Sequence, residues 1–334
     1  TSATSTTISF DLSSGEGTKT LTLTVSDNAG NTAALSKDVV YDASAPATPS
    51  EPASGFNDNG YYDSGGDTYY YDGNLADPGV EFNPVSSDRA LDDGTSGSGI
   101  AGYSADSGGS SPVDPIKLTE PAGNPVSIYA VDNAGNVSAA SLEVNVVADD
   151  AAPAVDGTVS IETRQPDNST VFDTGYVRDS QWIHFTFDII EADSGLAADP
   201  QVVLKVSGAE QETLTAGTSD GTTYSASYQF AGATFPAQGA IDYDISAEDN
   251  VGNQLSFAES STGITYDRDD PTGLSFSTPA YTNNASLSSI AVGATDSTSG
   301  VKEYEVSGEV ASAVTNTTSA TSTTISFDLS SGEG

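Results

Sequence analysis

The sequence has no cysteine, no methionine and one histidine, His184. It has 9 lysines and arginines but 48 acidic residues. Without cysteine, no disulfide can hold its domains together. Lysine and arginine bind nucleic-acid phosphates and anionic membranes, so a formal net charge of −39 argues against both partners. A single histidine leaves almost nothing for a histidine-based triad or a histidine-rich metal site.

Several other signals are missing. No stretch is long and apolar enough to insert into a bilayer, and the first residues do not resemble a signal peptide, so we expect a fragment, or part of a protein exported by a signal elsewhere. No nucleophile elbow, phosphate loop or dinucleotide fingerprint occurs. Paired carboxylates for glycoside hydrolysis stay open among so many acids, but nothing points to a cleft, and we expect a protein that is not an enzyme.

What the sequence does contain is a repeated turn. Asp-Asn-Ala-Gly-Asn or Asp-Asn-Val-Gly-Asn occurs at 27–31, 132–136 and 249–253. Each copy follows a run of alternating apolar and polar residues, at 21–25, 126–130 and 241–245. Alternation is typical of half-buried strands, and Asp first with Gly fourth suits a hairpin on a type I turn. An acidic, proline-containing linker follows each hairpin, at 41–46, 149–153 and 266–271.

The spacing of these hairpins, with abundant Thr, Ser, Gly and Tyr, predicts an all-β chain of tandem immunoglobulin-like β-sandwich modules in an elongated array. The expected divisions are the second half of a module at 1–44, whole modules at 45–150 and 151–270, and the first half of a module at 271–334. Residues 1–17 recur letter for letter as residues 318–334, which indicates one period of a tandem array. Joining 271–334 to 18–43 would make one complete module, in the manner of donor-strand exchange.

This topology would turn scattered aspartates into clusters, because the B–C and F–G loops of a sandwich lie beside the incoming linker. Acidic residues precede Ser-Gly-apolar motifs at 98–100, 194–196 and 299–301. The candidate ligands are Asp42, Asp92, Asp93 and Asp132 at the first linker; Asp149, Asp150, Asp193 and Asp249 at the second, with Asp188 or Glu191 nearby; and Asp267, Asp269, Asp270 and Asp296 at the third.

Calcium suits these clusters, since it takes six to eight oxygens at about 2.3–2.6 Å from flexible carboxylates, whereas Mg²⁺ demands a tighter octahedron. The plainer interpretation is that Asp favours turns and linkers and forms a salt-adapted surface, which explains each Asp better than the threefold coincidence. Crowded carboxylates repel, so bound Ca²⁺ would lock neighbouring modules and stiffen the array. No EF-hand loop and no glycine-rich nonapeptide repeat is present.

Two aromatic segments have alternative interpretations. Tyr61, Tyr62 and the run 69–71 could form a ligand platform, although alternating tyrosines more often fill one face of a sandwich. The segment 182–187 alternates cleanly, with Trp182 and His184 on one face and Ile183 and Phe185 on the other, which favours packing.

The turns, the Ser-Gly-apolar motifs, the Asp-x-x-Pro linkers and the acidic, cysteine-free composition resemble the bacterial immunoglobulin-like repeats of giant calcium-dependent adhesins of the RTX type, exported by type I secretion. The resemblance covers the whole chain, with 45–150 departing most. It implies an extracellular, cell-surface spacer that projects a binding tip and contacts neighbouring repeats of its array. The alternatives are a self-associating filament or surface-layer subunit with split modules completed by neighbours, and a binding module that uses the tyrosines.

Overall fold

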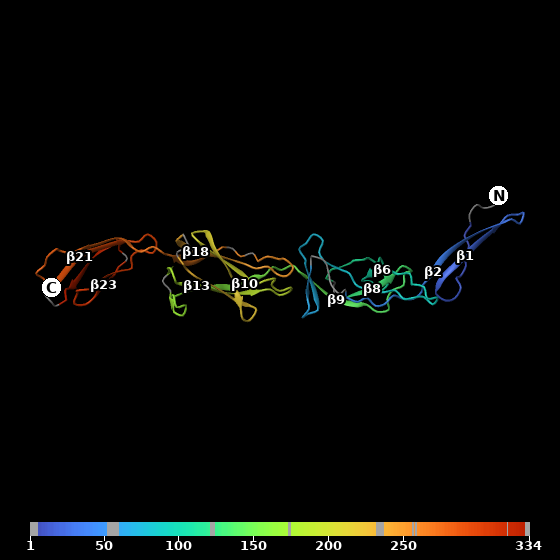
Figure 1. The fold of residues 1–334 in the computed structure, drawn as a ribbon, viewed down its shortest axis with the longest axis horizontal. Coiled ribbons are helices and arrows are strands. Elements are labelled where there is room, and N and C mark those ends of the chain that lie inside the picture. Colours follow the sequence, from blue (N-terminus) through green and yellow to red (C-terminus); the bar gives the residue numbers. More distant parts are fainter. Residues whose placement is uncertain are drawn as a thin grey trace. The chain divides into compact units, whose positions relative to one another are not determined.

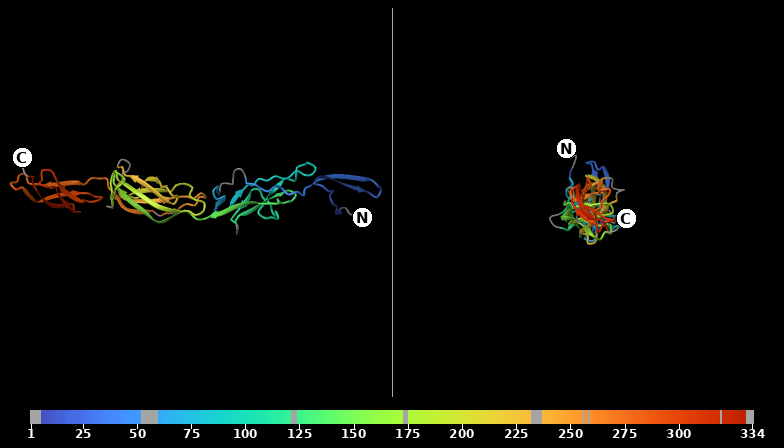
Figure 2. Two further views of the ribbon diagram at one scale, coloured as in Figure 1. Left: turned by 90° about the horizontal axis from the view of Figure 1, so that it is seen from below. Right: turned by 90° about the vertical axis from the view of Figure 1, so that its left-hand side faces the viewer.

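The computed structural model describes residues 6–51, 60–120, 124–172, 175–231, 237–255, 257, 259–318 and 320–330. All regular structure in these residues is β-strand, which confirms the predicted all-β class (Figure 1 and Figure 2). None of the described residues belongs to a helix long and apolar enough to cross a membrane. Contacts group the chain into two compact units. Unit 1 comprises Thr1–Ala151, Ala192–Gly195 and Asp249–Asn253, and unit 2 comprises Ala152–Glu191, Leu196–Glu248 and Gln254–Gly334.

The described part of unit 1 contains nine strands, most of them short and separated by turns rich in Gly and Asp. They are β1 (Gly17–Ser26), β2 (Thr32–Tyr41), β3 (Gly60–Asp63), β4 (Thr68–Asp72), β5 (Val80–Phe82), β6 (Ile100–Ser104), β7 (Ile116–Leu118), β8 (Val126–Asp132) and β9 (Leu142–Asp149).

Among its described residues, unit 1 forms three sheets. There the strands β1 and β2 pair only with each other, β5 pairs with β7, and the remaining strands form one sheet in the order β3-β4-β9-β8-β6. The core between the last two sheets includes Phe82, Ile128 and Val146, each 0% exposed. Alternation in β4 buries Tyr69 and Tyr71 in this core and leaves Tyr70 half-buried, as expected for tyrosines that fill one face.

The predicted hairpin turns are present at all three positions. In each copy the Gly amide bonds the Asp carbonyl three residues earlier, and the Asp amide bonds the carbonyl of the closing Asn. The glycines have φ values of 92° at Gly30, 91° at Gly135 and 100° at Gly252. Only glycine adopts this left-handed region without steric cost, which explains why it stands fourth in every copy.

Unit 2 contains fifteen strands within the described residues. They are β10 (Ala154–Arg164), β11 (Val171–Phe172), β12 (Tyr176–Val177), β13 (Trp182–Ile190), β14 (Gln201–Val206), β15 (Ala209–Thr215), β16 (Gly217–Thr218), β17 (Thr223–Gln229), β18 (Gly239–Ser246), β19 (Ser260–Tyr266), β20 (Thr272–Ser277), β21 (Ser286–Thr295), β22 (Glu303–Val306), β23 (Val314–Thr317) and β24 (Ser322–Asp328).

The strands up to β19 form two five-stranded sheets, β11-β10-β13-β17-β16 and β12-β19-β18-β14-β15, around one core, an arrangement consistent with a β-sandwich. Alternation in β13 places Ile183 and Phe185 in that core at 0% exposure, while Trp182 and His184 stay half-buried on the other face. Both residue sets lie on the faces that the alternation predicted.

The strands from β20 onward form two smaller sheets, β20-β21-β24 and β22-β23. A modest core joins them, with Ile290, Val292, Ile325 and Phe327 buried. The outer strand β20 is exposed along its whole length, and Leu274 and Phe276 are 78% and 54% exposed.

Candidate metal sites

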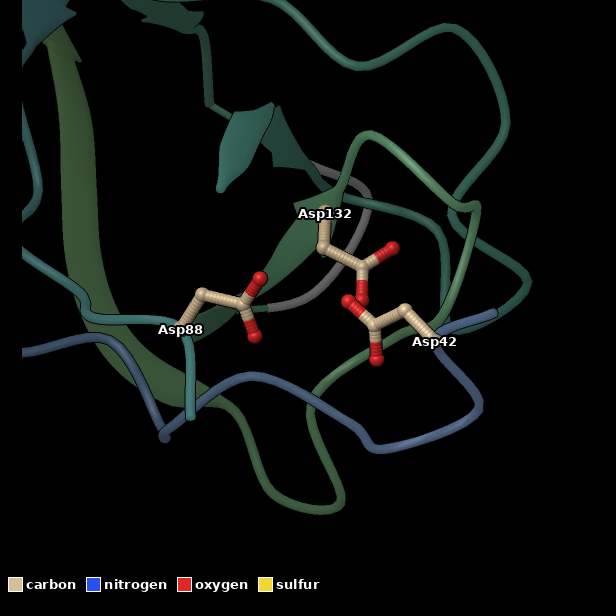
Figure 3. A group of neighbouring side chains, drawn as sticks. All are labelled: Asp42, Asp88 and Asp132. Carbon is tan, nitrogen blue, oxygen red and sulfur yellow. The ribbon is translucent and has the colours of Figure 1, made fainter. Parts of the chain in front are cut away.

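Three aspartates of unit 1 converge on a common point. Asp42, Asp88 and Asp132 each offer a carboxylate oxygen, and these oxygens all lie within 4.8 Å of one another. Figure 3 shows the three carboxylates turned toward one another from separate segments of the chain. Asp42 and Asp132 are 8% and 1% exposed, and Asp88 is half-buried, so the group is largely withdrawn from water.

The turn sequence itself holds Asp132 in place. Asp132 ends β8 and opens the turn, and both its oxygens accept hydrogen bonds of 2.8 Å from Asn136, Oδ1 from the backbone N–H and Oδ2 from Nδ2. Asp27 has the same two bonds with Asn31, and Asp249 has them with Asn253. Hydrogen bonds within the turn therefore hold this side chain.

Asp42 is brought to this turn by the segment that follows β2. Its Oδ2 accepts the Ser98 N–H at 2.8 Å, and its Oδ1 accepts the Ser44 N–H at 3.1 Å. Burial alone would raise the Asp42 pKa, but the hydrogen bonds from Ser98 and Ser44 and the charge of Arg89 outweigh it, so the pKa lies below its usual value. The carboxylate is therefore ionised at neutral pH despite its burial.

Sequence reasoning missed Asp88 and proposed Asp92 and Asp93 in its place. Residues 89–97 form a small hairpin, in which Gly97 N–H bonds the Arg89 carbonyl and Leu91 N–H bonds the Thr95 carbonyl. Asp92 and Asp93 therefore lie at its tip, while Asp88 lies at its base.

At the tip, the acids accept backbone N–H bonds, Asp92 from Glu16 at 3.3 Å and Asp93 from Thr18 at 2.9 Å. At the base, Asp88 Oδ2 accepts the Gly99 N–H at 2.6 Å. This bond joins Asp88 to the Ser98-Gly99 pair that also contacts Asp42. Asp88 could have been predicted from its position. It directly precedes a hairpin that ends in Gly97, next to the Ser-Gly motif.

A second acidic pair in unit 1 is buried more deeply. Asp149, the last residue of β9, is 0% exposed, Asp249 is 1% exposed, and their carboxylate oxygens lie within 4.8 Å of each other. Asp149 Oδ2 accepts the Ser194 N–H at 3.1 Å. Asp149 Oδ1 and the Ser194 hydroxyl are both buried with no hydrogen-bond partner among the described residues. A buried carboxylate oxygen without a donor is costly, and a bound cation is one way to satisfy it.

The two sites share one set of contacts. Nδ2 of the second turn residue bonds the carbonyl of the Ser-Gly serine, Asn133 to Ser98 at 2.9 Å and Asn250 to Ser194 at 2.8 Å. Nδ2 of the fifth turn residue bonds the backbone carbonyl of the linker aspartate.

Those linker bonds run from Asn136 to Asp42 at 3.2 Å and from Asn253 to Asp149 at 3.0 Å. The two asparagines of each turn thus bond different segments. The second turn residue bonds the Ser-Gly loop, and the fifth bonds the linker.

The other predicted residues of the second linker lie close by or elsewhere. Asp193 is exposed, and its pKa is raised by desolvation and by the charges of Asp149 and Asp150. Asp150 is exposed, and its carbonyl accepts the Asn74 Nδ2 at 3.1 Å. Asp188 lies on β13, opposite Asp156 of β10 and Thr223 of β17.

The third predicted set lies in unit 2. Asp267, Asp269, Asp270 and Asp296 line one open pocket of about 510 Å³. Asp296 Oδ1 accepts three backbone N–H groups of its own loop, from residues 298–300 at 2.8–3.0 Å. Within the described residues, these four carboxylates do not converge as those of Asp42, Asp88 and Asp132 do.

The donor chemistry of both converging groups is oxygen only. Carboxylates with backbone carbonyls nearby suit hard cations such as Ca²⁺, whereas Zn²⁺ and copper sites usually include nitrogen or sulfur ligands. The buried Asp149 Oδ1 is a carboxylate oxygen already withdrawn from water. These residues therefore fit a hard divalent cation.

No family model matches this sequence, and no curated protein matches it either.

Proposed function

We propose that this chain is a spacer segment of a large bacterial surface adhesin, made of tandem immunoglobulin-like modules and stiffened by Ca²⁺ at its linkers. The proposal places the protein outside the cell, with neighbouring repeats of its own array as partners and no catalytic role. Its modules are those expected from the sequence, with whole modules at 45–150 and 151–270.

The observation that carries the proposal is the orphaned Asp149 Oδ1. It is buried beside a second buried carboxylate, that of Asp249, and no described donor reaches it. A charge left in this state would cost several kcal/mol of stability. Ca²⁺ would take this oxygen as a ligand and neutralise the repulsion between the two acids.

The recurrence of the contacts supports a structural role for the cation. Asp42 follows a strand of one hairpin, and Asp88 and Asp132 belong to the stretch that comes after it in the chain. A cation held by all three would fasten the linker to that stretch. The same contacts recur around Asp149 and Asp249. A cation there would fasten the second linker in the same way, as a stiff spacer requires.

Calcium also supplies a reason for the acidic composition. Extracellular modules bind Ca²⁺ at about 10⁻⁴–10⁻³ M, so the sites would fill outside a cell and empty inside it. The chain would remain pliable during export and stiffen afterwards.

Titration calorimetry with CaCl₂, combined with thermal unfolding in calcium and in chelator, tests the proposal. At 100 times the Kd, one site that binds only the folded state adds about 2.7 kcal/mol of stability. We expect heat of binding, a higher Tm in calcium, and a more extended particle by small-angle X-ray scattering. MgCl₂ at the same concentration serves as the control and should give a smaller shift.

Identical unfolding curves and scattering profiles in calcium and in chelator would contradict the cation mechanism. The acids would then form only a salt-adapted surface.

A further inference from the structure

The β1–β2 hairpin has one apolar face and one polar face. The register pairs Leu23 with Leu35 and Val25 with Ala33, so these side chains share a face. The other face carries hydroxyl and carboxylate groups, with Thr20 bonded to Asp38. Leu23, Val25 and Leu35 are 50%, 58% and 60% exposed. Three neighbouring large aliphatic side chains at this exposure are unusual on a folded surface.

The same positions are covered in the other two copies of the hairpin. Leu23 stands four residues before the turn aspartate, as Ile128 and Ile245 do, and those residues are 0% and 2% exposed. Ile245 is covered by strands that come earlier in the chain, including Phe185 of β13 and Leu204 of β14. The cover that the β1–β2 hairpin requires is therefore a set of earlier strands of that type.

The strands β20 to β24 form such a set. The sheet order β20-β21-β24 matches β10-β13-β17, and the β22-β23 pair matches β14-β15. In unit 2 the closing strand β18 pairs with the edge of β14. The corresponding edge of β22 pairs with no strand in the described residues.

A groove lies between the two small sheets, where strands equivalent to β18 and β19 would pack. It measures about 520 Å³, and its apolar lining comes from both small sheets, at Leu274, Phe276, Val292, Val301, Tyr304 and Val306. Glu303 and Glu305 also line it, whereas the apolar face of the hairpin carries Lys37 opposite Leu21. The two surfaces are thus complementary in polarity and in charge.

One short sequence occurs twice in the chain, exposed in one copy and buried in the other. Residues 8–12 and 325–329 have the same sequence, yet Ile8 and Phe10 are 62% and 63% exposed, while Ile325 and Phe327 are 3% and 7% exposed. The buried copy belongs to β24, within the set of strands that forms the groove.

We propose that the β1–β2 hairpin of one copy docks in the β20–β22 groove of a second copy and completes a sandwich there. Strand β1 would pair with the open edge of β22, as β18 pairs with β14. The contact joins two different surfaces of one sequence, so it is head-to-tail, and each copy can both give a hairpin and accept one. This association is separate from the cation sites and does not require them.

Two variants of the full chain test it by analytical ultracentrifugation. Leu23→Asp removes the hairpin surface and keeps the groove, and Phe276→Asp removes the groove and keeps the hairpin. We expect the unmodified chain to gain mass with concentration and each variant alone to stay monomeric. An equimolar mixture should form a 1:1 dimer and stop there, because only one competent interface remains.

Val85→Asp is the matched control, since Val85 is 55% exposed and lies on neither surface. It should associate like the unmodified chain, and circular dichroism should show the same strand content in every variant. A monomeric unmodified chain at all concentrations, association of either variant alone, or a mixture that stays monomeric would overturn the proposal.

Discussion

Asp149 accepts the backbone N–H of Ser194 at one carboxylate oxygen and buries the other without a donor. These residues are 45 positions apart, and Ser98 donates in the same way to Asp42. Backbone donors thus hold both carboxylate oxygens of Asp42 but only one of Asp149.

Asp149→Asn should change stability in opposite directions with and without calcium. In chelator, loss of a buried charge beside Asp249 should leave stability equal or higher. In calcium, the gain of about 1–3 kcal/mol from one site should disappear. Asp199→Asn, at an exposed acid, is the control and should keep the gain. Chemical denaturation in both buffers checks this, and an Asp149→Asn chain that keeps its full calcium response would rule out Asp149 as a ligand.

Gly135→Ala should destabilise the protein by about 1–2 kcal/mol, because alanine resists the left-handed conformation. Gly135 has φ 91° and open space around its Cα, so strain is the only cost. Gly217→Ala is the control, since Gly217 also faces open space but does not have a positive φ. Urea denaturation of the two variants should separate them, and equal stabilities would show that the turn tolerates another conformation.

Tyr69→Ala should cost about 3–5 kcal/mol, the range for loss of a large buried aromatic side chain. Tyr69 is 5% exposed and packs on Tyr62 and Phe82, with ring centroids 4.5 Å and 5.3 Å apart. Tyr70→Ala, on the opposite face of β4, should cost less than about 1 kcal/mol. Thermal unfolding measures both, and the reverse order would favour a ligand platform over packing.

Stability should fall as pH drops below about 6.5, the ordinary histidine pKa. Burial, and then the charge of Arg164, lowers the pKa of His184 in the folded state. The unfolded chain therefore binds a proton first, so this stability is complete above pH 6.5 and is lost as the pH falls toward the folded pKa.

His184→Gln should flatten this dependence between about pH 5 and 7, because the chain has no other histidine. Fluorescence of Trp182, the single tryptophan, reports unfolding of the same strand. An unchanged slope in the variant would assign the pH dependence to carboxylates instead.

Local pattern predicted much of the fold. Alternation identified β13 and its buried face, and the turn sequence identified the hairpins around Gly30, Gly135 and Gly252, because strand period and turn geometry depend on neighbouring residues. Module boundaries remain predictions, since contacts divide the chain into two units with short exchanged segments.

The sequence predicted only part of the candidate site, and the reason is physical. Asp42 and Asp132 were predicted, and lie together, because each stands at a fixed place beside a turn or a linker. Asp88 was missed because its position depends on the closing of residues 89–97, which moves the nearer acids, Asp92 and Asp93, to the tip. Sequence distance to the Ser-Gly pair was a poor guide where a hairpin intervenes.

The parallel pairing of β4 with β9 has a mechanical consequence. Thr68–Asp72 run alongside Asn145–Asp149 in the same direction, and five residue pairs join them. A pull that enters the chain before β4 and leaves after β9 would slide these strands past each other. The bonds between them would be loaded in shear and would have to break together, whereas a hairpin opens one bond at a time. Resistance to tension would thus come from the β4–β9 pair inside this sheet, next to the buried Asp149.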